Sequence, residues 1–275
     1  MRMARKVMIV PVGFELDRVI DAQKFESCNV WHVLRNPRGG SDAVGEHSIY
    51  FGERVAKKVE AMHLLDFQVI EVRQSDLLGL VRAMAGIVKA ERAKDPAGEF
   101  VFNASSSTKT AAFAVTLVAG LCPAPVKILY LRPEVEITLM DLIVSGEKTL
   151  DDVRQVFLEH GECHSPFGAE YYPVIPLVTF TPAERAIIEH LASTRVAETV
   201  SSLVQAIAPG QKQRLRKDLV KAGWSVKALE RMHLVTSRKA NQSRTVAITP
   251  EGEVIAAALG MIDDGEGNNN LDQII

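Results

Sequence analysis

The chain has 275 residues, 47% of them hydrophobic and 24% charged, which is typical of one large or two ordinary globular domains and excludes a disordered chain. The longest apolar runs, such as residues 111–122, fall short of the ~18 residues of a membrane span, and the N-terminal apolar run is too short for a signal peptide. The net charge of −2 hides a basic segment, residues 175–250, with 12 Lys and Arg against 5 Asp and Glu, and an acidic end, residues 251–275, with 6 Asp and Glu and no Lys or Arg. We therefore expect no membrane association and an anionic partner for the basic segment.

The first ~140 residues alternate between strand and helix patterns. Short apolar runs predict strands at residues 6–12, 29–36, 67–72, 99–103 and 126–131. Segments with helical spacing separate them, at residues 14–24, 48–65, 76–94 and 108–120. This alternation predicts an α/β domain with a Rossmann-like parallel sheet and helices on both faces, in which ligands bind at the carboxyl ends of the strands.

The middle of the chain joins this domain to a different pattern. Residues 132–146 are ambiguous, with an edge hairpin as one interpretation, and residues 149–161 have helical spacing with a Thr–Asp capping signal. Residues 162–178 contain three prolines and predict a linker. The sequence thus places the first domain at residues 1–161.

The C-terminal part predicts helices, a hairpin and a tail. Helical patterns cover residues 181–193, 198–207 and 211–232, the last of them basic and open to a break at Gly223. Two short strands with a polar, basic tip follow within 234–252, then a helix over 252–262. This order predicts a winged helix-turn-helix domain over residues 179–262, and the acidic tail 263–275 is expected to be disordered.

A hydroxyl-rich stretch, 102-FNASSSTKTAAF-113, lies between the fourth predicted strand and the fourth predicted helix. A helix N-terminus offers free N–H groups and a partial positive charge, and Lys109 adds a full charge, so the stretch is a candidate anion site. Helix capping is the alternative, but it explains only one or two of the four hydroxyls. The glycines of a P-loop and of a G-x-G-x-x-G turn after the first strand are absent, which disfavours an ATPase or a nicotinamide dehydrogenase.

The same stretch resembles the signature of CARF domains, the CRISPR-associated Rossmann-fold ligand sensors. Their usual form is an apolar strand, Asp or Asn, and a loop like Thr/Ser–Gly–Gly–Thr–Lys, from which this chain departs with Ser106 and Ser107 at the positions where glycines are common. The resemblance covers roughly residues 1–140. With its C-terminal half, the whole chain looks like the branch that fuses this sensor to a winged helix, which includes archaeal CRISPR-associated regulators and related haloarchaeal regulators.

The resemblance implies a cytoplasmic homodimer that binds a cyclic oligoadenylate across its twofold axis, with cyclic tetra-adenylate as the first candidate. Carried onto this chain, the residues holding ligand phosphates and riboses are Asn103, Ser105, Ser106, Ser107, Thr108 and Lys109. The loop after the first strand would line the same cleft with Gly13, Phe14 and Glu15. Further candidates after the second and fifth strands are Arg35, Asn36 and Arg132, for which a solvated loop position is the alternative.

The basic segment predicts binding to double-stranded DNA, because Lys and Arg make the phosphate contacts that supply most of the affinity. The candidate residues are Lys212, Arg214, Arg216, Lys217, Lys221, Ser225, Lys227, Arg231, Arg238, Lys239 and Arg244, with Gln211 and Gln213 as further candidates for base contacts. The apolar residues expected on the inward face are Leu215, Leu219, Trp224, Val226, Leu229 and Leu234. A solvated helix face is the alternative interpretation of the charge run.

No cofactor, metal site or catalytic triad is predicted. His160, Cys163 and His164 lack an obvious fourth ligand for Zn²⁺, and the three cysteines, Cys28, Cys122 and Cys163, are too widely spaced for a disulfide framework, which favours a reducing cytoplasm. A ligand-responsive transcriptional regulator is the leading hypothesis. Two alternatives stay open: a metal-independent ring nuclease that cleaves the cyclic ligand, with Lys109 stabilising charge, and a regulator whose sensor is degenerate and only dimerises.

Overall fold

The computed structural model describes most of the chain and divides it into two compact units, Met1–Leu177 and Val178–Ile275. The described residues are 4–38, 43–122, 124–133, 146, 149–161, 166–174, 177–197, 199–207, 215–240 and 243–261. Within these, only the backbone is described for residues 43–45, 206–207, 215–218, 239–240 and 243–244. Among the described residues, no helix has the length and apolar character needed to cross a membrane.

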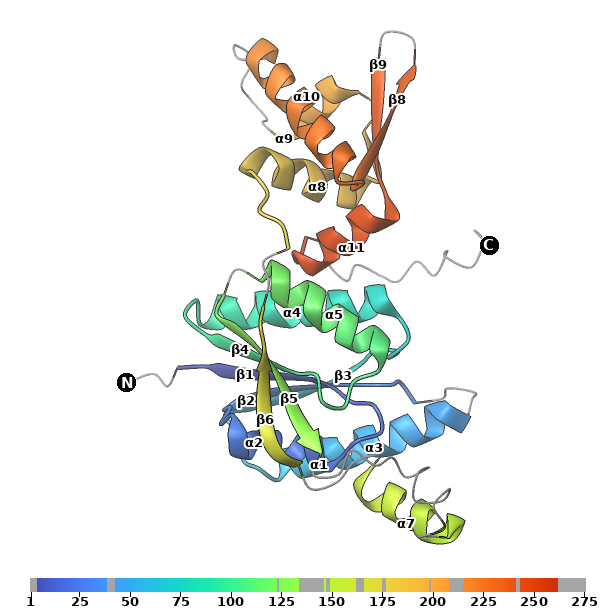
Figure 1. Ribbon diagram of the computed structural model, residues 1–275. Coiled ribbons are helices and arrows are strands. Elements are labelled where there is room, and N and C mark those ends of the chain that lie inside the picture. The colour runs from blue at the N-terminus through green and yellow to red at the C-terminus, as the bar shows by residue number, and fades with distance from the viewer. Residues whose placement is uncertain are drawn as a thin grey trace. The chain divides into compact units, whose positions relative to one another are not determined.

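The first unit is built on a six-stranded sheet with the order β3-β2-β1-β4-β5-β6 (Figure 1). Five strands run parallel: β1 (Lys6–Pro11), β2 (Val30–Arg35), β3 (Asp66–Glu71), β4 (Glu99–Asn103) and β5 (Val126–Pro133). The strands β1, β2 and β4 are almost wholly buried, which explains their near-continuous apolar sequences. The predicted fold class, α/β with a Rossmann-like parallel sheet, is confirmed.

Helices cover both faces of this sheet. Figure 1 shows α4 and α5 on one face and α1, α2 and α3 on the other. The helices of this unit are α1 (Asp17–Ile20), α2 (Ala22–Phe25), α3 (Ala43–Glu60), α4 (Leu77–Lys94), α5 (Lys109–Leu121) and α7 (Leu150–His160). Side-chain caps set three of the helix starts, because Asp76, Thr108 and Thr149 each accept a hydrogen bond from a backbone N–H of the first turn.

The segment expected to be a linker differs from the prediction, since it contains the sixth strand, β6 (Pro166–Tyr172), antiparallel to β5. Its proline stands at the first position of an edge strand, where the missing N–H costs no ladder hydrogen bond. The helical pattern at residues 14–24 also forms differently, as the two short helices α1 and α2. Nearly all of the ambiguous segment 132–146 lies outside the described residues.

The second unit follows the predicted element order of helix, helix, basic helix, hairpin and helix. Its elements are α8 (Pro182–Thr194), β7 (Val196–Ala197), α9 (Val200–Ile207), α10 (Leu215–Arg231), β8 (Val235–Ala240), β9 (Ser243–Ile248) and α11 (Pro250–Ala258), with an antiparallel sheet of order β7-β9-β8. The unit has its own core, which includes Ile187, Leu191, Leu203, Val226, Leu229 and Val246. The predicted tail, residues 263–275, lies outside the described residues.

In α10, the break that the sequence left open at Gly223 does not form, and the expected position of Trp224 is wrong. The helix runs unbroken through Gly223, because an isolated glycine costs a helix only ~1 kcal/mol and the tertiary packing of the flanking turns outweighs this. Trp224, expected on the inward face, is 67% exposed. Ala222, Val226 and Leu229 are buried instead, and the spacing of these three turns Trp224 outward.

Candidate functional site

Two loops meet where the strand order of the sheet reverses. From β1 the chain moves to β2 on one side, while β4 lies on the other side of β1 and leads to β5, so the crevice between the carboxyl ends of β1 and β4 is the topological switch point. The Gly13 N–H donates to the backbone oxygen of Ser106 at 2.8 Å and to its Oγ at 3.1 Å. A Cβ at Gly13 would lie 2.3 Å from the Ser106 oxygen. Only glycine permits this approach of the two loops.

The hydroxyls and the amide of the 103–107 loop are used to build the loop itself. The Oδ1 of the buried Asn103 accepts from the Ser105 N–H at 3.0 Å, and its Nδ2 donates to the Arg18 oxygen at 3.3 Å. Ser105 Oγ accepts from the Leu131 N–H of β5 at 2.8 Å, and Ser107 Oγ donates to the Ala104 oxygen at 3.0 Å. These groups therefore shape the loop and join it to its neighbours.

The N-terminus of α5 presents the polar groups that remain. Thr108 Oγ1 accepts from the Ala111 N–H at 3.1 Å and donates to the Gln74 oxygen at 2.9 Å. Among the residues that the structure describes, no hydrogen bond uses the backbone N–H groups of Thr108, Lys109 or Thr110. The Lys109 side chain is exposed beside them. Free N–H groups, the helix dipole and an ammonium group together favour an anion at this position.

Phe14 and Glu15 take part in packing at the same edge of the sheet. Glu15 forms an ion pair with Arg18 at 3.1 Å, and both side chains are about 95% buried. The Arg18 Nε also donates to the Leu131 oxygen at 2.9 Å. The Phe14 ring lies 6.3 Å from the Phe157 ring of α7. The loop after β1 is thus held between β5 and α7.

The candidates after the second and fifth strands, Arg35, Asn36 and Arg132, lie at strand ends and contact neighbouring elements. Arg35 pairs with Glu71 of the adjacent strand at 2.8 Å, and Arg132 pairs with Glu170 of β6. Asn36 donates from Nδ2 to the Ser48 Oγ at 2.8 Å. Neither arginine contact reaches the N-terminus of α5, whereas Asn36 is joined to it through Gln74.

Gln74 is a residue of this edge that sequence reasoning missed. Its N–H donates to Asn36 Oδ1 at 2.7 Å, its Nε2 donates to the Leu34 oxygen at 3.2 Å, and its own oxygen accepts from Thr108. It therefore links the ends of β2 and β3 to the start of α5. A single glutamine after a predicted strand carries no sequence signal, because its role depends on partners from two other segments, the end of β2 and the start of α5.

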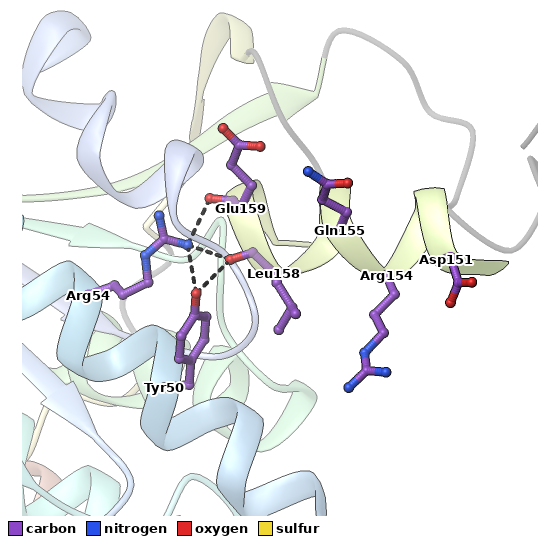
Figure 2. Close-up of a pocket in the computed structure, with 7 residues that line it drawn as sticks. All are labelled: Tyr50, Arg54, Asp151, Arg154, Gln155, Leu158 and Glu159. Carbon is purple, nitrogen blue, oxygen red and sulfur yellow. Dashed lines mark hydrogen bonds between the residues drawn. The ribbon is translucent and has the colours of Figure 1, made fainter. Parts of the chain in front are cut away.

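A separate open pocket of about 410 Å³ lies between α3 and α7 (Figure 2). Tyr50 and Arg54 converge there on the last carbonyls of α7, with the Tyr50 hydroxyl donating to the Leu158 oxygen at 3.0 Å and Arg54 donating to the Glu159 oxygen at 3.0 Å. Asp151, Arg154 and Gln155 complete the lining. No sequence-predicted site residue lines this pocket, and its hydrogen bonds serve to fix the C-terminus of α7.

His160 and the two described cysteines, Cys28 and Cys122, have structural roles. His160 Nδ1 lies 2.7 Å from Asp17 Oδ2, while Cys163 and His164 lie outside the described residues. Burial raises the pKa of the Cys28 thiol to about 12 and also raises the pKa of Cys122. Neither thiol is therefore activated as a nucleophile or a ligand.

The predicted DNA-contacting residues are described in part. Lys221, Lys227 and Arg231 are exposed on α10 and Arg238 is exposed on β8, while Ser225 is half-buried. Only the backbone is described for Arg216, Lys217, Lys239 and Arg244. Four further candidates lie outside the described residues: Gln211, Lys212, Gln213 and Arg214.

Comparisons with known proteins match the first unit to a family model and most of the chain to a solved structure. A family model described as "HFX_2341_N:-like, N-terminal" matches residues 6–136, slightly less than half of the chain. Curated proteins give no match. Among solved structures, a similar one is Enterococcus italicus Csm6 bound to cyclic hexa-2'-fluoro-hexa-dAMP, with 12% sequence identity, a TM-score of 0.43 and coverage of 84% of this chain. The alignment covers 57% of that protein, so the chain spans little more than half its length.

Proposed function

We propose that the chain is a ligand-responsive transcriptional regulator. Its first unit senses a cyclic oligoadenylate and its second unit binds double-stranded DNA. The observation that carries the first half is the junction of the Gly13 loop and the Ser106 loop at the switch point, beside the free N–H groups of α5 and the exposed Lys109. The family model that matches residues 6–136 covers this same unit.

The chemistry of the site fits a phosphate ester. Backbone N–H groups at a helix start bind phosphate oxygens without regard to the side chains, and Lys109 supplies the charge. Ser106 is buried against Gly13, so the ligand contacts would fall on the N–H groups that follow it, at Thr108, Lys109 and Thr110. A cyclic oligonucleotide repeats its phosphates around a ring, so two copies of one such site, related by a twofold axis, would hold one ligand. The proposal therefore includes a homodimer.

The second half of the proposal rests on unit two. A helix, a short strand, two further helices and a two-stranded hairpin follow one another in the order expected of a winged helix, in which the third helix would enter the major groove. That helix is α10, and it exposes Lys221, Lys227 and Arg231. The hairpin exposes Arg238 on β8. Cations on both elements suit a duplex backbone.

The test is isothermal titration of the full chain with cyclic tri-, tetra- and hexa-adenylate, repeated on Lys109→Ala. We expect one ligand per two chains and an affinity reduced about tenfold or more by the substitution, because a charge-assisted phosphate contact is lost. Lys58→Ala, an exposed lysine of α3, is the matched control and should bind like wild type. Absence of binding for all three nucleotides would refute the sensor, and chromatography of the recovered ligand would reveal cleavage.

One observation favours a second candidate, in which the first unit only dimerises. The Ser105, Ser106 and Thr108 oxygens already have partners within the protein. This candidate predicts that none of the three nucleotides shifts the melting temperature, while DNA binding persists.

A further inference from the structure

The indole of Trp224 is a large apolar group on the exposed surface of α10. The side chain is 67% exposed, and Val220, one turn earlier, is 56% exposed. Residues 220, 224, 227 and 231 follow one another at helical spacings of four and three, so they form one stripe along the helix. A tryptophan is the largest apolar side chain, and leaving it in water forgoes the free energy of its burial. The stripe is therefore a surface that a partner would cover.

Cations surround this apolar centre. Lys221, Lys227 and Arg231 are exposed next to it, and the Lys227 Nζ lies 5.9 Å from the centroid of the Trp224 ring. Glu230 is the one carboxylate among the described side chains of α10, and it accepts a hydrogen bond from the Ser237 hydroxyl of β8. Exposed positive charge next to an indole points to a polyanion as the partner, because the cores of protein–protein interfaces are depleted of charged residues.

We propose that Trp224 is a sequence-reading residue that contacts base edges in the major groove of DNA, with its indole face against thymine methyl groups. This inference rests on the proposed DNA-binding function of the second unit. The major groove admits an α-helix, and the C5-methyl group of thymine is the apolar feature that it displays. Lys221, which lies off this stripe, would then contact a phosphate at the edge of the groove, and Lys227 and Arg231 would enter the groove beside the indole.

The experiment begins with selection of a random 24-base-pair duplex pool by the full chain, with and without cyclic tetra-adenylate. The enriched duplex is then made with thymine or with deoxyuridine, which lacks the methyl group, and both forms are titrated with wild type and with Trp224→Ala. We expect deoxyuridine to weaken wild-type binding about fivefold or more, and Trp224→Ala to weaken binding to the thymine duplex by about as much or more. The variant should not distinguish the two duplexes, since the contact is already lost.

Two further variants separate sequence reading from charge. Lys221→Ala should weaken binding to the enriched duplex and to random duplex alike, and should lower the slope of the salt dependence by about one. Val196→Ala, on β7 and 48% exposed, is the matched apolar control and should bind like wild type. Trp224→Phe should retain part of the preference for thymine. Because Trp224 is exposed, its variants should melt close to wild type.

Three outcomes would contradict the inference, and they can be told apart. If Trp224→Ala discriminates thymine from deoxyuridine as wild type does, the indole does not read the methyl group. If the variant keeps its DNA affinity but sediments as a smaller species, the stripe is a contact between protein chains. If wild type enriches no duplex in either condition, the DNA-binding function itself fails, and this inference fails with it.

Discussion

At the scale of single residues, the junction of the two loops depends on the absence of a side chain at position 13. The Gly13 N–H donates to Ser106, whose backbone oxygen lies only 2.3 Å from the position that a Cβ at Gly13 would take. Gly86, on the exposed side of α4, is the opposite case, because nothing lies within 4 Å of its Cβ position. Substitution of glycine by alanine should therefore destabilise the protein at position 13 and not at position 86.

Gly13→Ala should destabilise the protein by about 1–3 kcal/mol and weaken binding of the cyclic ligand, because the loops must separate to admit the methyl group. Gly86→Ala should instead stabilise by up to about 1 kcal/mol, since alanine is the better helix former. Thermal unfolding of both variants measures the difference. Equal melting temperatures for the two variants would show that the loops do not form the close contact.

At the scale of elements, β6 is held to the sheet by more than its ladder. The nearly buried Glu26, just after α2, accepts from the Tyr171 hydroxyl of β6 at 2.5 Å and from Lys127 of β5 at 3.1 Å, and it also pairs with Lys6 of β1. Burial raises the pKa of Glu26, but the hydrogen bonds from Lys6, Tyr171 and Lys127 outweigh this and lower it from 4.5 to about 2. A single carboxylate thus joins three strands.

This carboxylate makes stability depend on pH. A folded pKa below the unfolded one stabilises the protein above pH ~4.5, and the contribution is lost as the pH falls toward about 2. Glu26→Gln should therefore lower the free energy of unfolding near pH 7 by roughly 3 kcal/mol, and by progressively less as the pH falls below 4.5.

Glu170→Gln is the control for Glu26→Gln. It removes the surface pair with Arg132 and should cost less than about 1 kcal/mol at any pH. Denaturant titrations between pH 7 and pH 3 measure both variants. A loss for Glu26→Gln that does not change with pH would contradict the assignment of the ionised carboxylate.

At the scale of the whole molecule, each unit has a separate hydrophobic core. The first is centred on β1 and β2, with Trp31 and Phe51 fully buried, and the second is centred on α8, α9 and α10. The two fragments 1–177 and 178–275 should therefore each fold alone and unfold cooperatively. Circular dichroism of the separate fragments tests this, and the lack of a thermal transition in either fragment would show that the units depend on each other.

Most elements of the first unit, and its fold class, could be predicted from local sequence. The strands β1 to β5, the cap of α5 at Thr108 and the helix starts at Asp76 and Thr149 could all be predicted, because apolar periodicity and capping depend on residues within one or two turns. The order of elements in the second unit followed from the same local signals.

The roles of the side chains in the candidate site depend on contacts between segments that are distant in the sequence. Ser105 bonds to Leu131 and Gly13 bonds to Ser106, so hydroxyls that looked free for a ligand have partners 26 and 93 residues away. The outward direction of Trp224 likewise depends on which neighbouring turns of α10 pack on the core. The strand β6 forms because it pairs with β5, which lies more than 30 residues earlier in the chain. These hydrogen bonds, side-chain directions and strand pairings arise from contacts between distant segments, so they cannot be predicted from local sequence patterns.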